Sequence, residues 1–290
     1  MAIKYKQNFC DYFCCLFMKG GSFCILNHKQ KIRKVRIMKI NEYEYYNNLA
    51  NWSFDEINYA SENFTNWVYE DEIVKHTTKD SKILDLGTAA GEKVLKHFPI
   101  CSEILGTDFS KEMIKEANQN LIKSGKKNIT FKVMNNLQMN TPDNYFDIVT
   151  ARHTVINSNQ IYKTLKIGGY LIIRGVDKLD CWELKRMFNR GQGFHDKKPI
   201  SLIDYEAILD TGFKNVELIP LHVIEYYKTK EDLYVLLLKV PILDDISEIQ
   251  DNEYERVPIE KNIFEKYVAQ NTTEKGIKLI RRYYGIIAQK

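Results

Sequence analysis

The stretch KILDLGTAAGE, residues 82–92, constrains the fold of this chain more than any other part of the sequence. An apolar run is closed by Asp85, and a turn of small residues from Gly87 to Gly91 follows it. A buried strand must therefore bend tightly into the next element. In an open parallel sheet, ligands bind at the exit of the first strand, where the strand order reverses. The stretch therefore predicts a site for a nucleotide-like cofactor.

Short apolar strands alternate with amphipathic helices after this turn, which is typical of a parallel sheet covered on both faces. After Pro199 the order changes, and two strands flank a long helical segment, residues 228–275. If these strands pair as an antiparallel edge, that segment is an inserted cap. The strands are expected at 81–87, 102–108, 128–135, 146–151, 169–176, 215–227 and 276–290, and the helices at 92–98, 110–125, 161–167 and 201–213.

The first 37 residues differ in composition from the rest and are expected to be a basic, Cys-rich leader. They hold four of the six cysteines, and we expect that translation begins at Met38. Residues 38–80 are predicted to form N-terminal helices, and residues 81–290 the main domain. Six cysteines in so long a chain form no disulfide framework, which favours a reducing cytoplasm.

The composition also argues against several classes of function. No run of about 18 uncharged apolar residues is present, so no membrane span is expected. No C-x2-C pair indicates a metal site. The formal charge of +4 comes largely from the leader, and the slightly acidic remainder argues against a nucleic-acid binder.

The turn itself discriminates between cofactors. A dinucleotide fingerprint, G-x-G-x-x-G, would place Glu92 at the third glycine, where a bulky carboxylate would face a pyrophosphate. A P-loop is excluded because no G-K-[ST] is present. The pattern acidic-x-G-x-x-x-G is satisfied by Asp85, Gly87 and Gly91. A carboxylate at the strand end suits the ammonium group of an amino-acid-like, cationic ligand.

With these motifs, the chain resembles the class I methyltransferases that use S-adenosylmethionine, over residues 81–227 and the last strand. LDLGTAAG is similar to their first motif, and LKIGGYLIIRG (165–175) is similar to their turn into strand five. The resemblance implies a doubly wound, mostly parallel seven-stranded sheet with an antiparallel edge strand. It also implies that Asp108 accepts hydrogen bonds from both ribose hydroxyls and that Asn135 takes the adenine amino group, while the backbone of Asn136 meets the adenine ring. The implied cofactor-binding residues are Asp85, Gly87, Thr88, Ala89, Gly91, Asp108, Phe109, Asn135, Asn136 and Leu137.

The acceptor is expected beyond strand four, where ARHTVIN (151–157) places Arg152 and His153 as candidate catalytic residues. His153 acts as a general base, orients a substrate oxygen, or bonds a neighbouring backbone carbonyl. Arg152 either holds an acidic acceptor or pairs with a nearby carboxylate. Arg190 and Gln192, in a polar segment with two glycines, either bind substrate or belong to a solvated loop. Three functions remain open: methyl transfer to a small molecule, methyl transfer to RNA, and S-adenosylmethionine binding without turnover.

Overall fold

The computed structural model of the chain describes residues 56–246 and 257–290, together with the backbone of five short strands outside those ranges. The predicted leader and the predicted helices before residue 56 otherwise lie outside the described residues. The short strands are β1 (Leu16–Met18), β2 (Phe23–Ile25), β3 (Arg33–Val35), β4 (Lys39–Ile40) and β12 (Tyr254–Glu255). The other elements are β5 (Tyr59–Asn63), α3 (Tyr69–His76), β6 (Lys82–Leu86), α4 (Glu92–His97), β7 (Glu103–Asp108), α5 (Lys111–Ser124), β8 (Ile129–Val133), β9 (Phe146–Arg152), α6 (Ser158–Thr164), β10 (Leu165–Val176), α7 (Trp182–Phe188), α8 (Ile200–Thr211), β11 (Lys214–Tyr227), α9 (Lys230–Lys239), η1 (Pro241–Leu243), α10 (Lys261–Asn271), β13 (Thr272–Thr273) and β14 (Gly276–Gln289).

One sheet organises the molecule, with its strands in the order β5-β11-β14-β10-β9-β6-β7-β8 and with β13 paired to β14. The five strands from β10 to β8 are parallel, and β14 is antiparallel to both β10 and β11. Strand order reverses between β6 and β9, which makes this the point where a ligand binds in such a sheet. The predicted doubly wound fold is therefore confirmed, with β5 and β13 added to the seven predicted strands.

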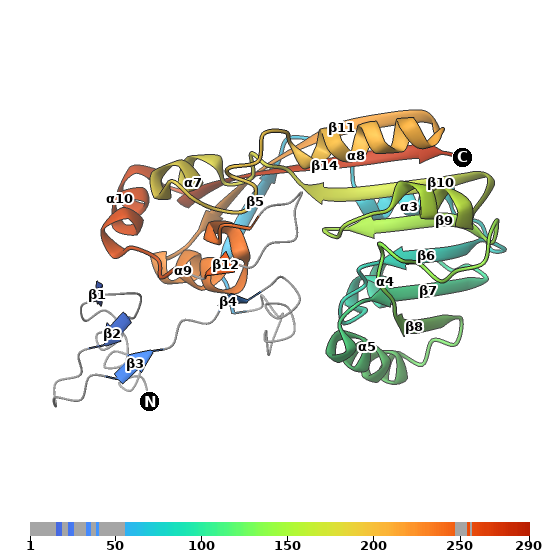
Figure 1. Ribbon diagram of the computed structural model, residues 1–290, viewed down its shortest axis with the longest axis horizontal. Coiled ribbons are helices and arrows are strands. Elements are labelled where there is room, and N and C mark those ends of the chain that lie inside the picture. The colour runs from blue at the N-terminus through green and yellow to red at the C-terminus, as the bar shows by residue number, and fades with distance from the viewer. Residues whose placement is uncertain are drawn as a thin grey trace.

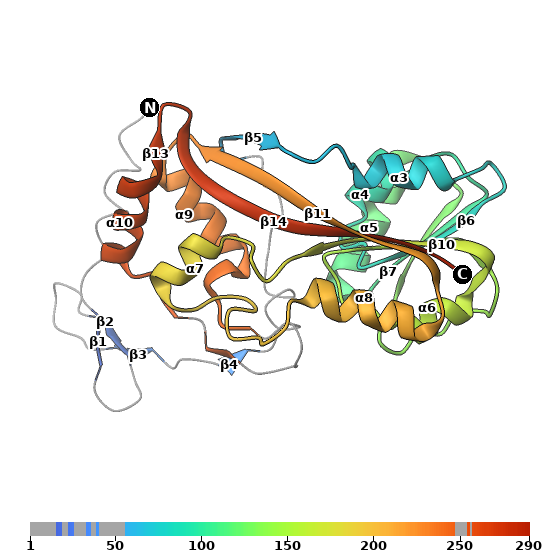
Figure 2. The ribbon, with the colours of Figure 1, turned by 90° about the horizontal axis from the view of Figure 1, so that it is seen from above.

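Helices cover both faces of the parallel strands, as Figure 2 shows with α3 and α4 on one side and α6 and α8 on the other. Alternate residues of the strands enter two separate cores, for example Ile83 and Leu84 in β6. Because both faces are buried, the central strands β6 and β9 are buried at nearly every position, whereas the edge strand β8 alternates buried and exposed residues. This explains why the strands could be located from apolar runs alone.

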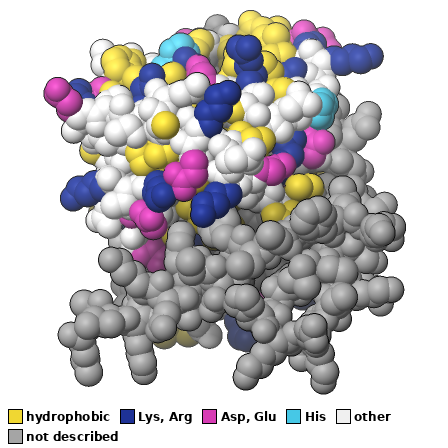
Figure 3. All heavy atoms as spheres, turned by 90° about the vertical axis from the view of Figure 1, so that its left-hand side faces the viewer, with side chains coloured by type: hydrophobic (Ala, Val, Ile, Leu, Met, Phe, Trp, Pro, Cys, Tyr) yellow, Lys and Arg dark blue, Asp and Glu magenta, His cyan; other side chains and the backbone are white. Residues whose placement is uncertain are grey.

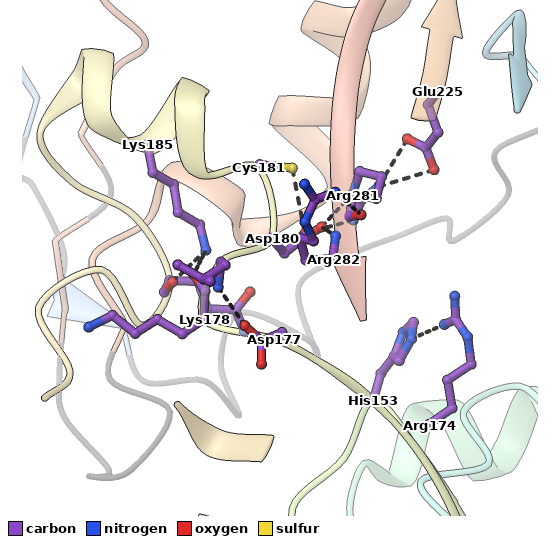
Figure 4. A network of polar contacts seen from close by, with 12 residues as sticks. His153, Arg174, Asp177, Lys178, Asp180, Cys181, Lys185, Glu225, Arg281 and Arg282 are labelled. Carbon is purple, nitrogen blue, oxygen red and sulfur yellow. Dashed lines mark hydrogen bonds and ion pairs between the residues drawn. The ribbon is translucent and has the colours of Figure 1, made fainter. Parts of the chain in front are cut away.

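The strands β11 and β14 run past the parallel sheet into a second lobe, the cap (Figure 1). Between them lie α9, η1 and α10, within the predicted insertion at 228–275. Together with α7, these helices bury a core of their own, which includes Leu184, Leu237 and Phe264. Arg281 of β14 is fully engaged at the base of the cap, where it pairs with Asp180 at 2.9 Å and Glu225 at 3.1 Å (Figure 4).

The helical prediction for the segment before residue 76 was wrong for Tyr59–Asn63, which is the strand β5. It pairs with the edge of β11, and the rings of Tyr59 and Tyr227 stack at 5.5 Å. The exposed edge of β11 offers unpaired backbone groups, and a nonlocal partner overrides the local pattern. The predicted helix 161–167 is also displaced: α6 begins after the capping Asn157 and ends at Thr164, and β10 follows at once.

None of the described helices is long and apolar enough to cross a membrane. In the part of the chain that the structure describes, no group of three or more His, Cys, Asp or Glu side chains is placed to hold a metal ion.

Candidate functional site

The glycine loop, residues 87–91, connects β6 to α4 at the carboxyl edge of the sheet. Gly87 and Gly91 adopt φ values of 70° and 74°, in the left-handed region that favours glycine. A Cβ added to Gly87 would lie 2.6 Å from the Thr154 side chain, and one added to Gly91 would lie 2.6 Å from the Phe131 ring. Both glycines are therefore required by backbone conformation and by space.

Ala89 is the strained position of the loop, because it adopts a φ of 47° with a side chain that disfavours this region. The neighbouring Ala90 is buried and does not share this conformation.

Replacing Ala89 with Gly should raise the free energy of unfolding by about 0.5–1 kcal/mol. A left-handed conformation costs an alanine about 1–2 kcal/mol, and the larger entropy of glycine in the unfolded chain offsets about half of that. Urea unfolding measures the change, and Ala90→Gly is the matched control, which should lose stability. Equal losses in both variants would contradict a strained loop.

Asp85 lies buried beneath the loop, with a 5% exposed side chain. The Thr150 hydroxyl of β9 donates a hydrogen bond of 2.6 Å to its Oδ1. Burial raises the pKa of Asp85 to about 6, although the hydrogen bond from Thr150 and the charge of Arg152 act in the other direction. Because burial outweighs these effects, the ionised carboxylate is stabilised further by a cation beside it.

Cofactor affinity should therefore depend on pH through Asp85. The raised pKa means that the free protein holds a proton on this carboxyl below about pH 6, and a ligand ammonium group must displace it. We expect affinity for S-adenosylhomocysteine to fall about tenfold from pH 7 to pH 5, because only about a tenth of the carboxyl is ionised at pH 5. Calorimetry at several pH values measures this. The dependence should disappear in Asp85→Asn, and a dependence that persists there would assign it to another group.

Asp108 ends β7 and joins three parts of the site. Its Oδ2 accepts the backbone N–H of Ala89 at 3.0 Å, and its Oδ1 accepts that of Ser110 at 2.9 Å. Burial raises the pKa of Asp108, against the effect of these backbone donors. The carboxylate thus fixes the glycine loop to the start of α5, where Ser110 is the N-cap as predicted. The next residue, Phe109, exposes 40% of its surface.

The loop after β8 lies next to Asp108, whose backbone oxygen accepts the N–H of Met134 at 2.9 Å. Asn135 is exposed, and its Oδ1 accepts the N–H of Leu137 at 2.8 Å, so its side chain also shapes the loop. Asn136 is buried and donates to the Thr154 hydroxyl at 2.9 Å, while its Oδ1 has no hydrogen-bond partner among the described residues. Leu137 is 47% exposed. The predicted adenine-binding residues therefore lie in one loop, beside Asp108 at the carboxyl edge of the sheet.

His153 follows β9 and contacts the next strand. Its backbone N–H donates to the Arg174 oxygen at 2.8 Å, and the Arg174 guanidinium donates to its Nε2 (Figure 4). Its ring stacks on Tyr283 at 5.6 Å. The surrounding protein and the charges of Arg152, Arg174 and Arg281 hold the pKa of His153 well below its usual value, although solvent reaches the ring. The imidazole is therefore neutral near pH 7, with Nε2 already occupied as an acceptor.

A cavity of about 210 Å³ begins at these strand ends and extends over β11. Arg152 and Arg174 line it from the sheet, and Trp67 and Tyr69 line it from the segment that leads into α3. The Trp67 indole nitrogen and the Arg152 Nε are buried without a hydrogen-bond partner among the described residues. The remaining lining residues are Asn63, Val68, Glu70, Leu221 and Val223.

Arg190 and Gln192, predicted either to bind substrate or to belong to a solvated loop, are not among the residues that line this cavity. The guanidinium of Arg190 donates to the backbone oxygens of Leu243 and Pro258 and pairs with Glu260 at 3.0 Å. The backbone oxygen of Gln192 accepts the buried Lys185 ammonium at 2.7 Å. Arg190 thus ties the end of η1 to the segment before α10, and Gln192 anchors its loop to α7 through Lys185.

Comparisons with known proteins agree with this geometry. The family described as "Methyltransferase domain" matches residues 77–233. An uncharacterized methyltransferase, YcgJ, from Bacillus subtilis is 29% identical over 87 residues, which are 30% of this chain and 34% of the relative. A demethylmenaquinone methyltransferase from Bacteroides fragilis is 26% identical over 120 residues, which are 38% of this chain and 49% of the relative.

These matches thus span between a third and a half of the curated relatives' length. Among solved structures, a putative methyltransferase from Bacillus halodurans has a TM-score of 0.49 and 16% identity, over 76% of this chain and 98% of that one. The family match covers more than half of the chain and includes the glycine loop, Asp108 and the strand ends around the cavity. The chain therefore belongs to the methyltransferase domain family, of the S-adenosylmethionine-dependent class I type that its motifs resemble.

Proposed function

We propose that the protein transfers the methyl group of S-adenosylmethionine to a small-molecule acceptor bound in the cavity beside β9 and β10. The single observation that supports this most is the position of the cavity, which begins at the carboxyl ends of β9 and β10, next to the strand-order reversal. A volume of about 210 Å³ suits a small molecule or one part of a larger one.

On the donor side, each predicted residue has a chemical task in this proposal. Asp85 receives the donor's ammonium group, and Asp108 receives its ribose hydroxyls. The exposed apolar side chains of Phe109 and Leu137 flank the adenine, and Asn135 and the buried Asn136 supply polar contacts at its edge. The backbone of Gly87, Thr88, Ala89 and Gly91 surrounds the amino-acid part. The donor supplies an activated methyl group on a sulfonium.

The chain's contribution to catalysis is positioning and exclusion of water, which lower the barrier of an in-line displacement. His153 is neutral, and its Nε2 accepts a hydrogen bond from Arg174, so the ring orients that guanidinium rather than removing a proton. Arg152 holds the acceptor from the end of β9. We therefore assign His153 a positioning role and Arg152 a binding role.

The domain division follows the same proposal. Residues 81–290 form the catalytic unit with the cap at 228–275, and the segment that contains β5 and α3 completes the acceptor cavity. We also propose a cytoplasmic location, in keeping with the buried free thiols of Cys101 and Cys181.

Methyl transfer to RNA is the second candidate, and donor binding without turnover is the third. Figure 3 views the cap side, where Lys and Arg side chains are interspersed with Asp and Glu on the part of the surface that is coloured. An RNA-binding surface would be dominated by positive charge, so this face gives the second candidate little support.

Parallel labelling separates the three candidates. The protein is incubated with a methyl-labelled donor and either the small-molecule fraction of a cell extract or an RNA pool. Label in the small-molecule fraction supports the proposal, and label in RNA supports the second candidate. If calorimetry shows that the protein binds the donor but neither pool contains a labelled product, the third candidate, donor binding without turnover, is supported.

A further inference from the structure

We infer that the methyl acceptor carries an anionic group, a carboxylate or a phosphate, which the guanidinium groups of Arg152 and Arg174 bind together. The inference rests on the proposed function and names the class of acceptor for the same site.

The two arginines are direct neighbours across the sheet. Arg152 of β9 and Arg174 of β10 are paired in the parallel register. Residues opposite each other in adjacent strands project to the same face of the sheet, and both side chains line the cavity. Two like charges in this arrangement repel each other, so a ligand that carries a negative charge between them would be favoured.

The local carboxyl groups balance the charge of this pair only in part, because Asp85 interacts with Arg152, and Glu70 with Arg174, without a close ion pair. Among the described residues, no carboxylate lies within 4.0 Å of either guanidinium. Glu70 lines the same cavity and is the one acidic residue among its lining residues. Lys93 of α4 adds positive charge nearby, and its pKa is lowered by partial burial and by the charge of Arg152. The buried Arg152 Nε also lacks a partner. Leaving a buried charged group unpaired is costly, which points to a ligand as the missing acceptor.

The guanidinium of Arg174 is held in one orientation before any ligand binds. It lies over the Tyr283 ring, at 4.1 Å from the ring centroid, and one of its nitrogens donates to His153 Nε2. A guanidinium has five N–H donors, so the others remain for an anion, and a planar fork matches a carboxylate or a phosphate. His153 thus has the role of a positioning residue for Arg174.

A donor carboxylate is the other possible source of negative charge, and the strand order argues against it. The glycine loop follows β6, whereas β10 lies beyond β9, about 10 Å away at the usual strand spacing. From Arg152 the cavity extends in the opposite direction, toward Leu221 and Val223 of β11. An anion between the two arginines therefore lies on the acceptor side.

The test uses inorganic phosphate and benzoate as probes, titrated by calorimetry into the full-length protein with and without S-adenosylhomocysteine. One probe should bind saturably to the wild type, and Arg174→Leu should weaken that binding about tenfold to a hundredfold, as expected when a charge-assisted bidentate contact is lost. Arg174→Lys should retain part of the affinity. Arg186→Leu, an exposed arginine of α7, is the matched control and should bind like the wild type.

Three results would overturn the inference. In the first, neither probe binds the wild type. In the second, Arg174→Leu binds the probes as tightly as the wild type does, while the variant still unfolds cooperatively. The third result uses decarboxylated S-adenosylhomocysteine as a further ligand: if Arg174→Leu weakens the binding of S-adenosylhomocysteine but not of this analogue, the arginines belong to the donor site. A protein that binds the probes but not S-adenosylhomocysteine would instead contradict the proposed function alone.

Discussion

Replacing Asp108 with Ala should lower the affinity for S-adenosylhomocysteine about a hundredfold or more. The carboxylate accepts the N–H groups of Ala89 and Ser110, so its removal releases the glycine loop, and it also removes the proposed acceptor for the ribose hydroxyls. Each charge-assisted hydrogen bond contributes about 1.5–3 kcal/mol, and a tenfold change in affinity corresponds to about 1.4 kcal/mol. Calorimetry at pH 7.5 measures the loss.

Asp147 offers a matched control for this change. It is also a carboxylate that accepts a backbone N–H, that of Lys82 at 2.8 Å, but it lies at the opposite end of β6 from the glycine loop. Asp147→Ala should reduce the free energy of unfolding and leave the affinity unchanged. Asp108→Asn should be intermediate, because its single side-chain oxygen can replace only one of the two lost acceptors. Equal losses of affinity in Asp147→Ala would show that general destabilisation, not the site, is being measured.

Replacing Gly91 with Ala should reduce the free energy of unfolding by about 1.5–4 kcal/mol and displace the glycine loop. The left-handed φ of 74° costs an alanine about 1–2 kcal/mol, and its smaller entropy in the unfolded chain offsets about half of that. Its methyl group would also lie 2.6 Å from the Phe131 ring, and overpacking of a core typically costs about 1–3 kcal/mol. Because the loop must shift to relieve the overlap, affinity for the donor should fall as well. Urea unfolding and calorimetry measure the two effects.

Gly125 separates strain from overlap. It ends α5 with a φ of 67°, and nothing lies within 4 Å of a Cβ added there. Gly125→Ala should therefore show the strain without overlap, a net loss of about 0.5–1 kcal/mol after the smaller unfolded-state entropy of alanine is counted, with donor affinity unchanged. If Gly91→Ala and Gly125→Ala lost the same stability and the same donor affinity, the close packing of Gly91 on Phe131 would not explain the position of the glycine loop.

The donor half of the site was predictable because its signals are local. Gly87 and Gly91 bracket a turn that needs positive φ, and Ser110 and Gly125 bound α5 where the sequence places a cap and a stop. Such features depend on residues within a few positions of each other. The strand Tyr59–Asn63 was missed because its pairing with β11 joins residues that are about 160 positions apart in the sequence.

The acceptor half was less predictable, because it depends on register. Arg174 is the one charged residue in the apolar stretch 169–176, and only its pairing opposite Arg152 makes the two a unit. Their shared position at the ends of consecutive parallel strands was a signal that the sequence did contain. For Arg190 the local sequence suggested a site where the described part of the structure has none. A basic residue beside two glycines resembles a binding loop, but the N–H groups of Arg190 donate to backbone carbonyls of the cap. Such tertiary partners cannot be inferred from local composition.

Titration of the wild-type protein with S-adenosylhomocysteine, and separately with NAD, tests the central claim most directly. The claim is that the glycine loop between β6 and α4 binds the methyl donor. We predict saturable binding of S-adenosylhomocysteine at one site per chain, lost in Asp108→Ala, and no binding of NAD. Binding of NAD in the absence of any binding of S-adenosylhomocysteine would contradict the account.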